Sequence, residues 1–192
     1  MKNGTRIGTD LDGVIIDHQA HKCNLALKHG FPLELWQTNS NLMRSFVPSD
    51  LYDTIRDALY AEMTVTAPPV SGALEHLRTL GVETYIISRR RAGSIRYAQE
   101  WMAKHRVYDI IPAERIFFCE TKEDKRLICE RLGISAYIDD QISILNLLPD
   151  TIKRVLLDPD GVAERLEKIG PLHVAKTWEE AAKILKESPA EK

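Results

Sequence analysis

Short apolar runs alternate with longer amphipathic stretches along most of this 192-residue chain. The runs have the length and composition of buried strands, and the stretches between them place apolar residues at helical spacing. One such stretch, SGALEHLRTLG at 71–81, begins with a serine suited to an N-cap and ends with a glycine. Strands that alternate with helices predict an α/β fold with a doubly wound, mostly parallel sheet. The expected strands are RIGTD, VETYIIS, RIFFCE, AYIDD, RVLLD and LHVAK.

Residues 18–66 interrupt this alternation, since they contain two helical patterns and no convincing strand. The second pattern, SDLYDTIRDALYAEM, carries its apolar residues on one helical face: Leu51, Ile55 and Leu59. The dipeptide Pro68-Pro69 that follows cannot continue a helix. We therefore expect residues 1–17 and 67–192 to form the α/β core, and residues 18–66 to form a small helical cap inserted after the first strand.

Polar residues of particular kinds stand at the ends of the predicted strands. They are Asp10 and Asp12 after the first strand, Ser88 at the end of the second, Asp139 and Asp140 at the end of the fourth, and Lys122 and Lys125 in the helix before the fourth. In a parallel sheet these positions meet at one edge, where ligands bind. Two carboxylates about 6 Å apart repel by roughly 3 kcal/mol at an effective dielectric near 20, so a cation must neutralise them. Oxygen ligands favour Mg²⁺, and a lysine and a hydroxyl beside the metal suit a phosphate ester.

Composition and charge narrow the range of functions. The formal net charge of −2 gives no electrostatic basis for binding a nucleic-acid polymer or an anionic membrane. No apolar stretch approaches the length of a transmembrane helix, and the opening residues MKNGTRIG lack the apolar run of a signal peptide. Three cysteines without paired spacing, Cys23, Cys119 and Cys129, are interpreted as reduced thiols of a cytoplasmic protein. The expected partner is a small phosphorylated metabolite, bound by a monomer or a homodimer.

The order D-x-D-G-V, strand-ending serine, lysine and D-D resembles the haloacid dehalogenase (HAD) superfamily. The match runs from residue 5 to about 145 and includes the segments PPVSGALEHLRTLGVETYIIS and KRLICERLGISAYIDD. The later segment HVAKTWEEAAKIL resembles the closing strand and helix of nucleotidase-like members. The resemblance implies a Mg²⁺-dependent phosphatase that hydrolyses a small phosphomonoester, and within that class it favours a 5′-nucleotidase.

The resemblance also implies a role for each motif residue. Asp10 would be the nucleophile that forms an aspartyl-phosphate, and Asp12 the general acid and then the general base. The Mg²⁺ ion would be held by the Asp10 side chain, the Asp12 backbone carbonyl and Asp139. Ser88 and Lys125 would bind the phosphoryl group, although Lys122 is an alternative for the lysine. Asp140 would bind the metal through water or hold another ligand in place.

Each motif also has a purely structural interpretation. Asp12-Gly13 is a common turn, Ser88 could cap a helix, and the lysines could be solvated surface charges. Four motifs in the family's order favour the functional interpretation of the joint pattern. Two rivals are a catalytically silent HAD-fold protein that binds phosphate or metal, and a receiver-like signalling domain. A receiver carries its adjacent acid pair at the first strand and its lysine late, whereas here the lysine precedes the pair.

Three further groups of residues lie outside these motifs. The spacing of His18, His21, Cys23 and His29 matches no zinc site, and the first two are expected on a cap helix near the active site. The run Arg89–Arg91 could draw an anionic substrate inward, but Arg90 and Arg91 are expected in a solvated loop. Most of the cap aromatics are expected to pack, and one or two could stack on a base or line a substrate pocket: Phe31, Trp36, Phe46, Tyr52 and Tyr60.

Overall fold

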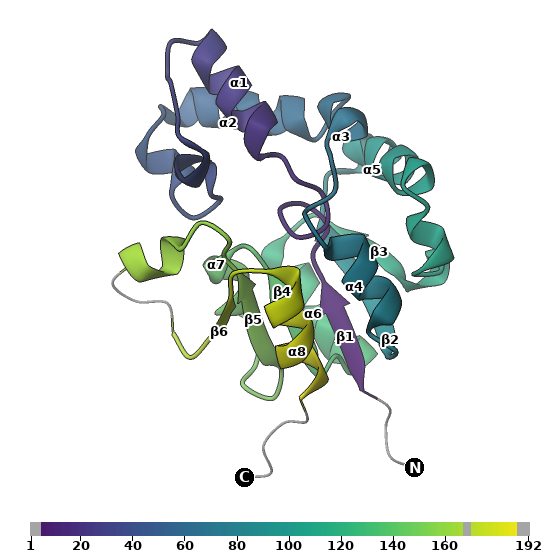
Figure 1. Ribbon diagram of the computed structural model, residues 1–192. Helices are drawn as coiled ribbons and strands as arrows, with labels where there is room; N and C mark the ends of the chain where they lie inside the picture. The colour runs from purple at the N-terminus through teal and green to yellow at the C-terminus, as the bar shows by residue number, and fades with distance from the viewer. Residues whose placement is uncertain (1–4, 167–169, 188–192) are drawn as a thin grey trace.

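A six-stranded parallel sheet in the order β3-β2-β1-β4-β5-β6 forms the centre of the molecule (Figure 1). The structure is a computed structural model and describes residues 5–166 and 170–187. The strands are β1 (Arg6–Thr9), β2 (Glu83–Arg89), β3 (Ile116–Cys119), β4 (Ala136–Asp139), β5 (Lys153–Leu157) and β6 (His173–Ala175). Each overlaps one of the six segments predicted as strands, although β2 ends and β5 begins one residue outside its segment. The prediction of a doubly wound α/β fold is confirmed.

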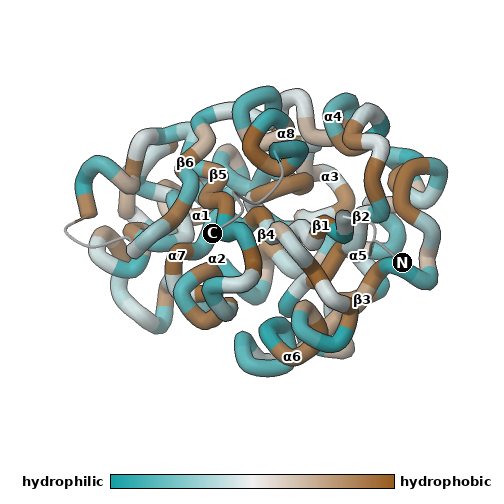
Figure 2. The backbone as a smooth tube through the Cα atoms, turned by 90° about the horizontal axis from the view of Figure 1, so that it is seen from below, coloured by the Kyte–Doolittle hydropathy of each residue, from teal (hydrophilic) through white to brown (hydrophobic). Residues whose placement is uncertain are grey.

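Helices cover both faces of this sheet, because successive strand residues point to opposite sides. Ile86 and Ile138 belong to one hydrophobic cluster, whereas their neighbours Ile87 and Tyr137 belong to another. In Figure 2, hydrophilic segments dominate the periphery of the molecule, including much of α6. The core helices are α4 (Ala73–Thr79), α5 (Ala92–Lys104), η3 (Val107–Asp109), η4 (Ala113–Arg115), α6 (Lys122–Leu132), α7 (Ile142–Leu145), η5 (Val162–Arg165) and α8 (Trp178–Lys186).

The register of the central strands aligns the ends that carry the polar motifs. Thr9 of β1 lies beside Ile86 of β2 on one side and Ile138 of β4 on the other. The backbone N–H of Asp10 then donates to the carbonyl of Ile138 at 2.9 Å. The residues after Thr9, Ile86 and Ile138 therefore emerge together at the carboxyl edge of the sheet.

Two helix starts illustrate how local sequence sets the element boundaries. Thr121 begins α6 with a capping box, in which its hydroxyl accepts from the Asp124 N–H and the Asp124 carboxylate accepts from the Thr121 N–H. This fixed start places Lys125 in the first turns of α6, below the sheet edge. The serine cap predicted for α4 is wrong: the N-cap is Gly72, with a φ of 76°, and it makes no side-chain hydrogen bond. The left-handed turn at this position suits glycine, and it displaces Ser71 from the capping site.

Five helical segments lie between β1 and α4 and sit over the carboxyl edge of the sheet (Figure 1). They pack around a separate hydrophobic cluster made of Ala26, Met43, Val47, Leu51, Ile55 and Leu59. The helix predicted over SDLYDTIRDALYAEM ends early, and the Thr64 hydroxyl donates to the freed Leu59 carbonyl at 2.6 Å. The division at residues 18 and 66 into two domains stays a prediction. The segments are α1 (Gln19–Lys28), η1 (Leu35–Thr38), η2 (Met43–Ser45), α2 (Ser49–Leu59) and α3 (Met63–Thr66).

Two paired backbone segments connect this helical insertion to the sheet. The Asp17 N–H donates to the Pro68 carbonyl at 2.9 Å, and the Val70 N–H donates to the Ile15 carbonyl at 2.8 Å. The outgoing and returning chains are therefore held side by side at the base of the insertion. All three cysteines are free thiols. Across residues 5–166 and 170–187, no helix has both the length and the apolar character needed to cross a membrane.

Candidate active site

Three buried aspartates converge at the carboxyl edge of the sheet. One carboxylate oxygen from each of Asp10, Asp139 and Asp140 lies within 4.8 Å of the other two. Burial raises the pKa of Asp10 to about 7 and the pKa of Asp139 to about 6, because the charged carboxylate loses its hydration. Burial raises the pKa of Asp140 as well. An isolated cluster of this kind would hold protons near neutral pH, so its charge depends on the cations around it.

Lys125 is the cation that the protein itself supplies to this cluster. Its ammonium nitrogen lies 2.7 Å from Asp139 Oδ2 and 3.1 Å from Asp10 Oδ1, and the residue is only 1% exposed. Burial lowers the pKa of Lys125, but the two carboxylates outweigh it and hold the pKa well above its usual value. Lys122 instead donates to the Ser143 hydroxyl at 2.7 Å. Of the two candidate lysines, Lys125 is the one that contacts Asp10.

Asp140 is positioned by a glycine and by the helical insertion between β1 and α4, called the cap from here on. Gly13 has a φ of +81°, and a Cβ at this position would lie 2.4 Å from Asp140 Oδ2, so the close approach requires glycine. Ser40 donates its hydroxyl to Asp140 Oδ2 at 2.6 Å, and the Asn41 amide donates to the Asp140 carbonyl at 2.8 Å. The loop between η1 and η2 thus contacts the site directly. The role of Asp140 as a metal-binding or supporting residue stays a prediction.

The donor set fits a hard divalent cation. Asp10 Oδ1 and Asp140 Oδ1 are buried oxygens without a hydrogen-bond partner among the described residues. Lys125 approaches Asp10 Oδ1 without the geometry of a hydrogen bond. Buried carboxylate oxygens that lack partners are costly unless a cation satisfies them, and Mg²⁺ prefers such ligands. Asp10, Asp139 and Asp140 are therefore suited to hold Mg²⁺, whereas the Asp12 carboxylate points into a different set of contacts.

The Asp12 carboxylate is bound by a buried arginine that the sequence analysis placed in solvent. Arg90 donates from Nε to Asp12 Oδ2 at 2.9 Å and from Nη2 to Oδ1 at 2.5 Å. His18 Nε2 lies 2.8 Å from Oδ1, and the Ser88 hydroxyl lies 3.5 Å from Oδ2. Burial raises the pKa of Asp12, but Arg90 first and then His18 outweigh it and hold the pKa far below its usual range. Asp12 is therefore ionised at neutral pH, and the hydrogen it shares with His18 is assigned to Nε2.

Arg90 also joins the core to the cap. The residue is 1% exposed, so the prediction that it lies in a solvated loop is wrong. Its Nη1 donates to the carbonyls of Tyr60 at 3.4 Å and Ser94 at 3.3 Å, and its Nη2 lies 3.2 Å from the Thr64 hydroxyl. The burial is possible because the Asp12 carboxylate neutralises the guanidinium. Arg91, the next residue, is exposed as predicted.

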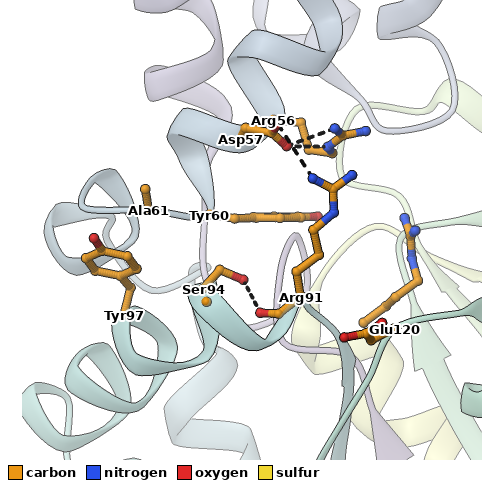
Figure 3. A pocket seen from close by; sticks show the side chains of 10 residues that line it. Arg56, Asp57, Tyr60, Ala61, Arg91, Ser94, Tyr97 and Glu120 are labelled. Atoms are coloured by element: carbon orange, nitrogen blue, oxygen red, sulfur yellow. Dashed lines mark hydrogen bonds and ion pairs between the residues drawn. The ribbon is translucent and has the colours of Figure 1, made fainter.

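Among the cavities that open between the cap and the core, one of about 220 Å³ reaches Asp140. A narrow one of about 40 Å³ reaches Asp12 and His18, and a wider one of about 410 Å³ lies outside it. Arg56, Tyr60 and Arg89 line both cavities, so the two share a wall. Figure 3 shows the wider cavity, with the Tyr60 ring seen edge-on below Arg56 and Asp57. The cap aromatic Tyr52 also lines the narrow cavity. Tyr52 and Tyr60 are thus the two cap aromatics that line these cavities, in line with the expectation of one or two.

Most predicted site residues meet at this place, and several contacting residues were not predicted. Strand-end positions indicated the aspartates and Ser88, and the family resemblance indicated Lys125. The strand alternation that places Arg90 on the same side as Ser88 could have indicated the arginine. No sequence signal indicated Ser40 and Asn41, because they lie in an irregular loop about a hundred residues before Asp140. His18 lies at the start of α1, against the site.

Comparisons with known proteins address the fold. No family model and no curated protein matches the chain. A haloacid dehalogenase-like protein of unknown function from Agrobacterium tumefaciens has a TM-score of 0.68 at 13% identity, covering 95% of this chain and 98% of its own. The HAD hydrolase YfnB from Bacillus subtilis, bound to magnesium, has a TM-score of 0.59 at 18% identity, covering 96% and 99%. A dehalogenase with an intermediate complex has a TM-score of 0.59 at 13% identity, covering 98% and 100%. The chain thus has the HAD-like fold that the motifs predicted, and these likenesses do not distinguish a phosphatase from a dehalogenase.

Proposed function

We propose that this protein is a Mg²⁺-dependent phosphatase of the HAD superfamily that hydrolyses a small phosphomonoester. The observation that carries the proposal is the contact of Lys125 with both Asp10 and Asp139 inside a buried cluster of three carboxylates. Such a cluster combines a nucleophile, a metal site and a cation for the phosphate within a few ångströms. The HAD-like fold supports the proposal, since its neighbours include hydrolases and one of them holds magnesium.

Asp10, Asp139 and Asp140 would hold the metal, together with the backbone carbonyl of Asp12 that the family resemblance implies. When bound, Mg²⁺ would orient the phosphoryl group and reduce its repulsion from the attacking carboxylate. The Lys125 ammonium group lies 3.1 Å from Asp10 Oδ1 and offsets negative charge on this carboxylate. Ser88 stands at the end of β2, where its hydroxyl can donate to a phosphoryl oxygen.

Hydrolysis would proceed in two steps. An Asp10 carboxylate oxygen attacks phosphorus, a new O–P bond forms, and the bond from phosphorus to the leaving alcohol breaks. The leaving oxygen takes a proton and departs. Water then attacks the aspartyl-phosphate, which releases inorganic phosphate, regenerates the Asp10 carboxylate and returns a proton to the general base.

Asp12 is equipped for the second of these steps. As an ionised carboxylate beside Arg90 and His18, it can accept the proton from the attacking water. The first step needs a proton on Asp12, and the contact with Arg90 opposes protonation. The acid role therefore requires that Asp12 leave Arg90 while the leaving group is protonated. The cap residues Tyr60 and Thr64 hold Arg90 in place, so a movement of the cap could release it.

Two other functions are compared with this one. Dehalogenases share the fold, but the family resemblance assigns phosphate-ester chemistry to chains with a second aspartate at the position of Asp12. A catalytically silent protein that binds phosphate or metal is the second candidate, because the bidentate Arg90 contact occupies Asp12. Within the phosphatase class, a 5′-nucleotidase is the branch that the sequence resemblance favours. The cytoplasmic location and the monomeric or dimeric state stay predictions.

The deciding test measures phosphate release from p-nitrophenyl phosphate, sugar phosphates and nucleoside 5′-monophosphates, in Mg²⁺ and in EDTA. We expect turnover that needs Mg²⁺ and disappears in Asp10→Asn. Asp50→Asn is the matched control, because Asp50 is an exposed carboxylate of α2 outside the site. Equal activity of Asp10→Asn and the wild type would refute the mechanism. No turnover on any substrate, despite Mg²⁺ binding, would favour the silent binding protein.

A further inference from the structure

The cavity of about 410 Å³ lies beside the narrow cavity that reaches Asp12, and its own lining includes no residue of the carboxylate cluster. It shares Arg56, Tyr60 and Arg89 with the narrow cavity that ends at Asp12. A phosphomonoester whose phosphorus lies at Asp10 would extend its alcohol portion along this shared wall. The argument rests on the proposed phosphatase function, because that function fixes where the phosphate lies. The chemistry of the wider cavity then describes the rest of the substrate.

Three arginines line the wider cavity, and their charges are balanced to different degrees. Arg56 lies 2.8 Å from the carboxylates of both Asp53 and Asp57, so the protein already neutralises it. Arg91 lies 3.8 Å from the same Asp57 carboxylate, as Figure 3 shows. Arg89 differs from both, because no carboxylate among the described residues pairs with it.

The Arg89 side chain makes no hydrogen bond or ion pair within residues 5–166 and 170–187. Glu120 also lines the cavity, but no ion pair joins it to Arg89. Arg89 is half-buried at the end of β2, directly after the phosphate-binding position Ser88. A half-buried guanidinium loses part of its hydration, and a charge-assisted partner would restore its hydrogen bonds.

Neighbouring cations increase the positive potential at this point. Burial and the charge of Arg89 lower the pKa of Lys122, and Arg44 from the cap acts in the same direction. The Arg44 guanidinium lies 3.3 Å from the Asp53 carboxylate and stacks at 3.9 Å from the ring centroid of Tyr52, which lines the narrow cavity. The core and the cap thus each bring cations to the same region. An anion from outside the protein would complete this arrangement.

We propose that the wider cavity binds the alcohol portion of the substrate, and that Arg89 recognises a second anionic group on it. The substrate class is a phosphomonoester that carries a carboxylate or a further phosphate. The planar guanidinium suits both groups, because its parallel N–H donors match their paired oxygens. A neutral nucleobase stacked on Tyr60 is the alternative occupant. It is less favoured because the Arg90 guanidinium already lies 4.9 Å from the centroid of that ring.

The test compares substrates that differ only in the second anion. Glycerol 3-phosphate and 3-phosphoglycerate form one pair, and glucose 6-phosphate and glucose 1,6-bisphosphate form a longer one. We expect the wild type to favour the doubly anionic member by about tenfold to a hundredfold in kcat/KM, the range of a charged hydrogen bond. Arg89→Gln should bring this ratio close to one. It should leave kcat/KM for the singly anionic member within about threefold of the wild type, because that substrate has no second anion for Arg89 to bind. Arg78→Gln is the matched control, because Arg78 is exposed on the last turn of α4.

Each remaining outcome separates this inference from the proposed function. A ratio near one for both pairs in the wild type would overturn the inference, and so would a ratio that Arg89→Gln leaves unchanged. A preference for uridine 5′-monophosphate that survives Arg89→Gln would assign the cavity to a base. If the wild type turns over no monoester, the proposed function fails, and the same pairs are compared by calorimetric binding. A binding preference that disappears in Arg89→Gln would then support the inference alone, and equal binding would refute it.

Discussion

The buried contact between Asp12 and Arg90 predicts a large and specific loss of stability in Arg90→Met. This change keeps the bulk of the side chain and removes the guanidinium that donates twice to Asp12. Removing one partner of a buried ion pair costs about 3–5 kcal/mol, since the other charge stays without compensation. For a chain of this size, each 1 kcal/mol lowers the Tm by about 2–4 °C, so the expected fall is roughly 6–20 °C.

Urea unfolding at pH 7, followed by circular dichroism, measures the free energy of unfolding of each variant. The double variant Asp12→Asn, Arg90→Met should lose less than the sum of its parts, with a coupling of about 2–3 kcal/mol. Arg91→Met is the control, because Arg91 is exposed and its removal should cost no more than about 0.5 kcal/mol. Additive single changes, or a cost of Arg90→Met similar to that of Arg91→Met, would refute the reasoning.

Three further predictions concern the carboxylate cluster. In EDTA, the free energy of unfolding should fall as the pH rises from about 4 to about 7: folded Asp10, with a pKa of about 7, keeps a proton that the unfolded chain releases near pH 3.9. Urea titrations across this range check the slope, which should shrink in Asp10→Asn, and an equal slope in both proteins would contradict the assignment. Lys125→Met should cost about 3–5 kcal/mol in the same assay, because it leaves two buried carboxylates without their cation, and a loss below 1 kcal/mol would contradict it. Gly13→Ala should lower the free energy of unfolding more than Gly30→Ala does. Both positions have φ above +80°, but a Cβ at Gly13 would meet Asp140, whereas nothing lies within 4 Å of a Cβ at Gly30. Equal losses of stability would show that Asp140 does not require the glycine.

The strand ends show how far the sequence could predict the site. The apolar runs located every strand, and the parallel topology then brought Asp10, Ser88 and Asp139 to one edge. The family resemblance, through the distance along the chain from Lys125 to Asp139, made Lys125 the preferred lysine, and its ammonium group lies 2.7 Å from Asp139. These inferences succeed because periodicity and chain order decide them, and both are visible in one sequence.

Other features depend on tertiary contacts that a single sequence does not contain. A run of three arginines is typical of a solvated loop. Strand alternation places Arg90 on the side of Ser88, but the Asp12 carboxylate that neutralises the buried guanidinium is identified only in the structure. The same holds for Ser40, whose bond to Asp140 links an irregular loop to a distant strand. The prediction that Ser71 is the N-cap of α4 is wrong for a local reason. The N-cap position is taken by Gly72, whose backbone is left-handed.

The paired segments at the base of the helical insertion make it an exchangeable cassette. Its two ends leave and return side by side, joined through Asp17–Pro68 and Ile15–Val70, and it has a hydrophobic cluster of its own. A replacement with the same end-to-end spacing would leave the register of β1 and β2 undisturbed. Such a graft would have to reproduce the bonds of the cap to Asp140 and to Arg90. Under the proposed function, substrate recognition would then change with one continuous piece of chain, while the residues at the carboxyl edge of the sheet keep their positions.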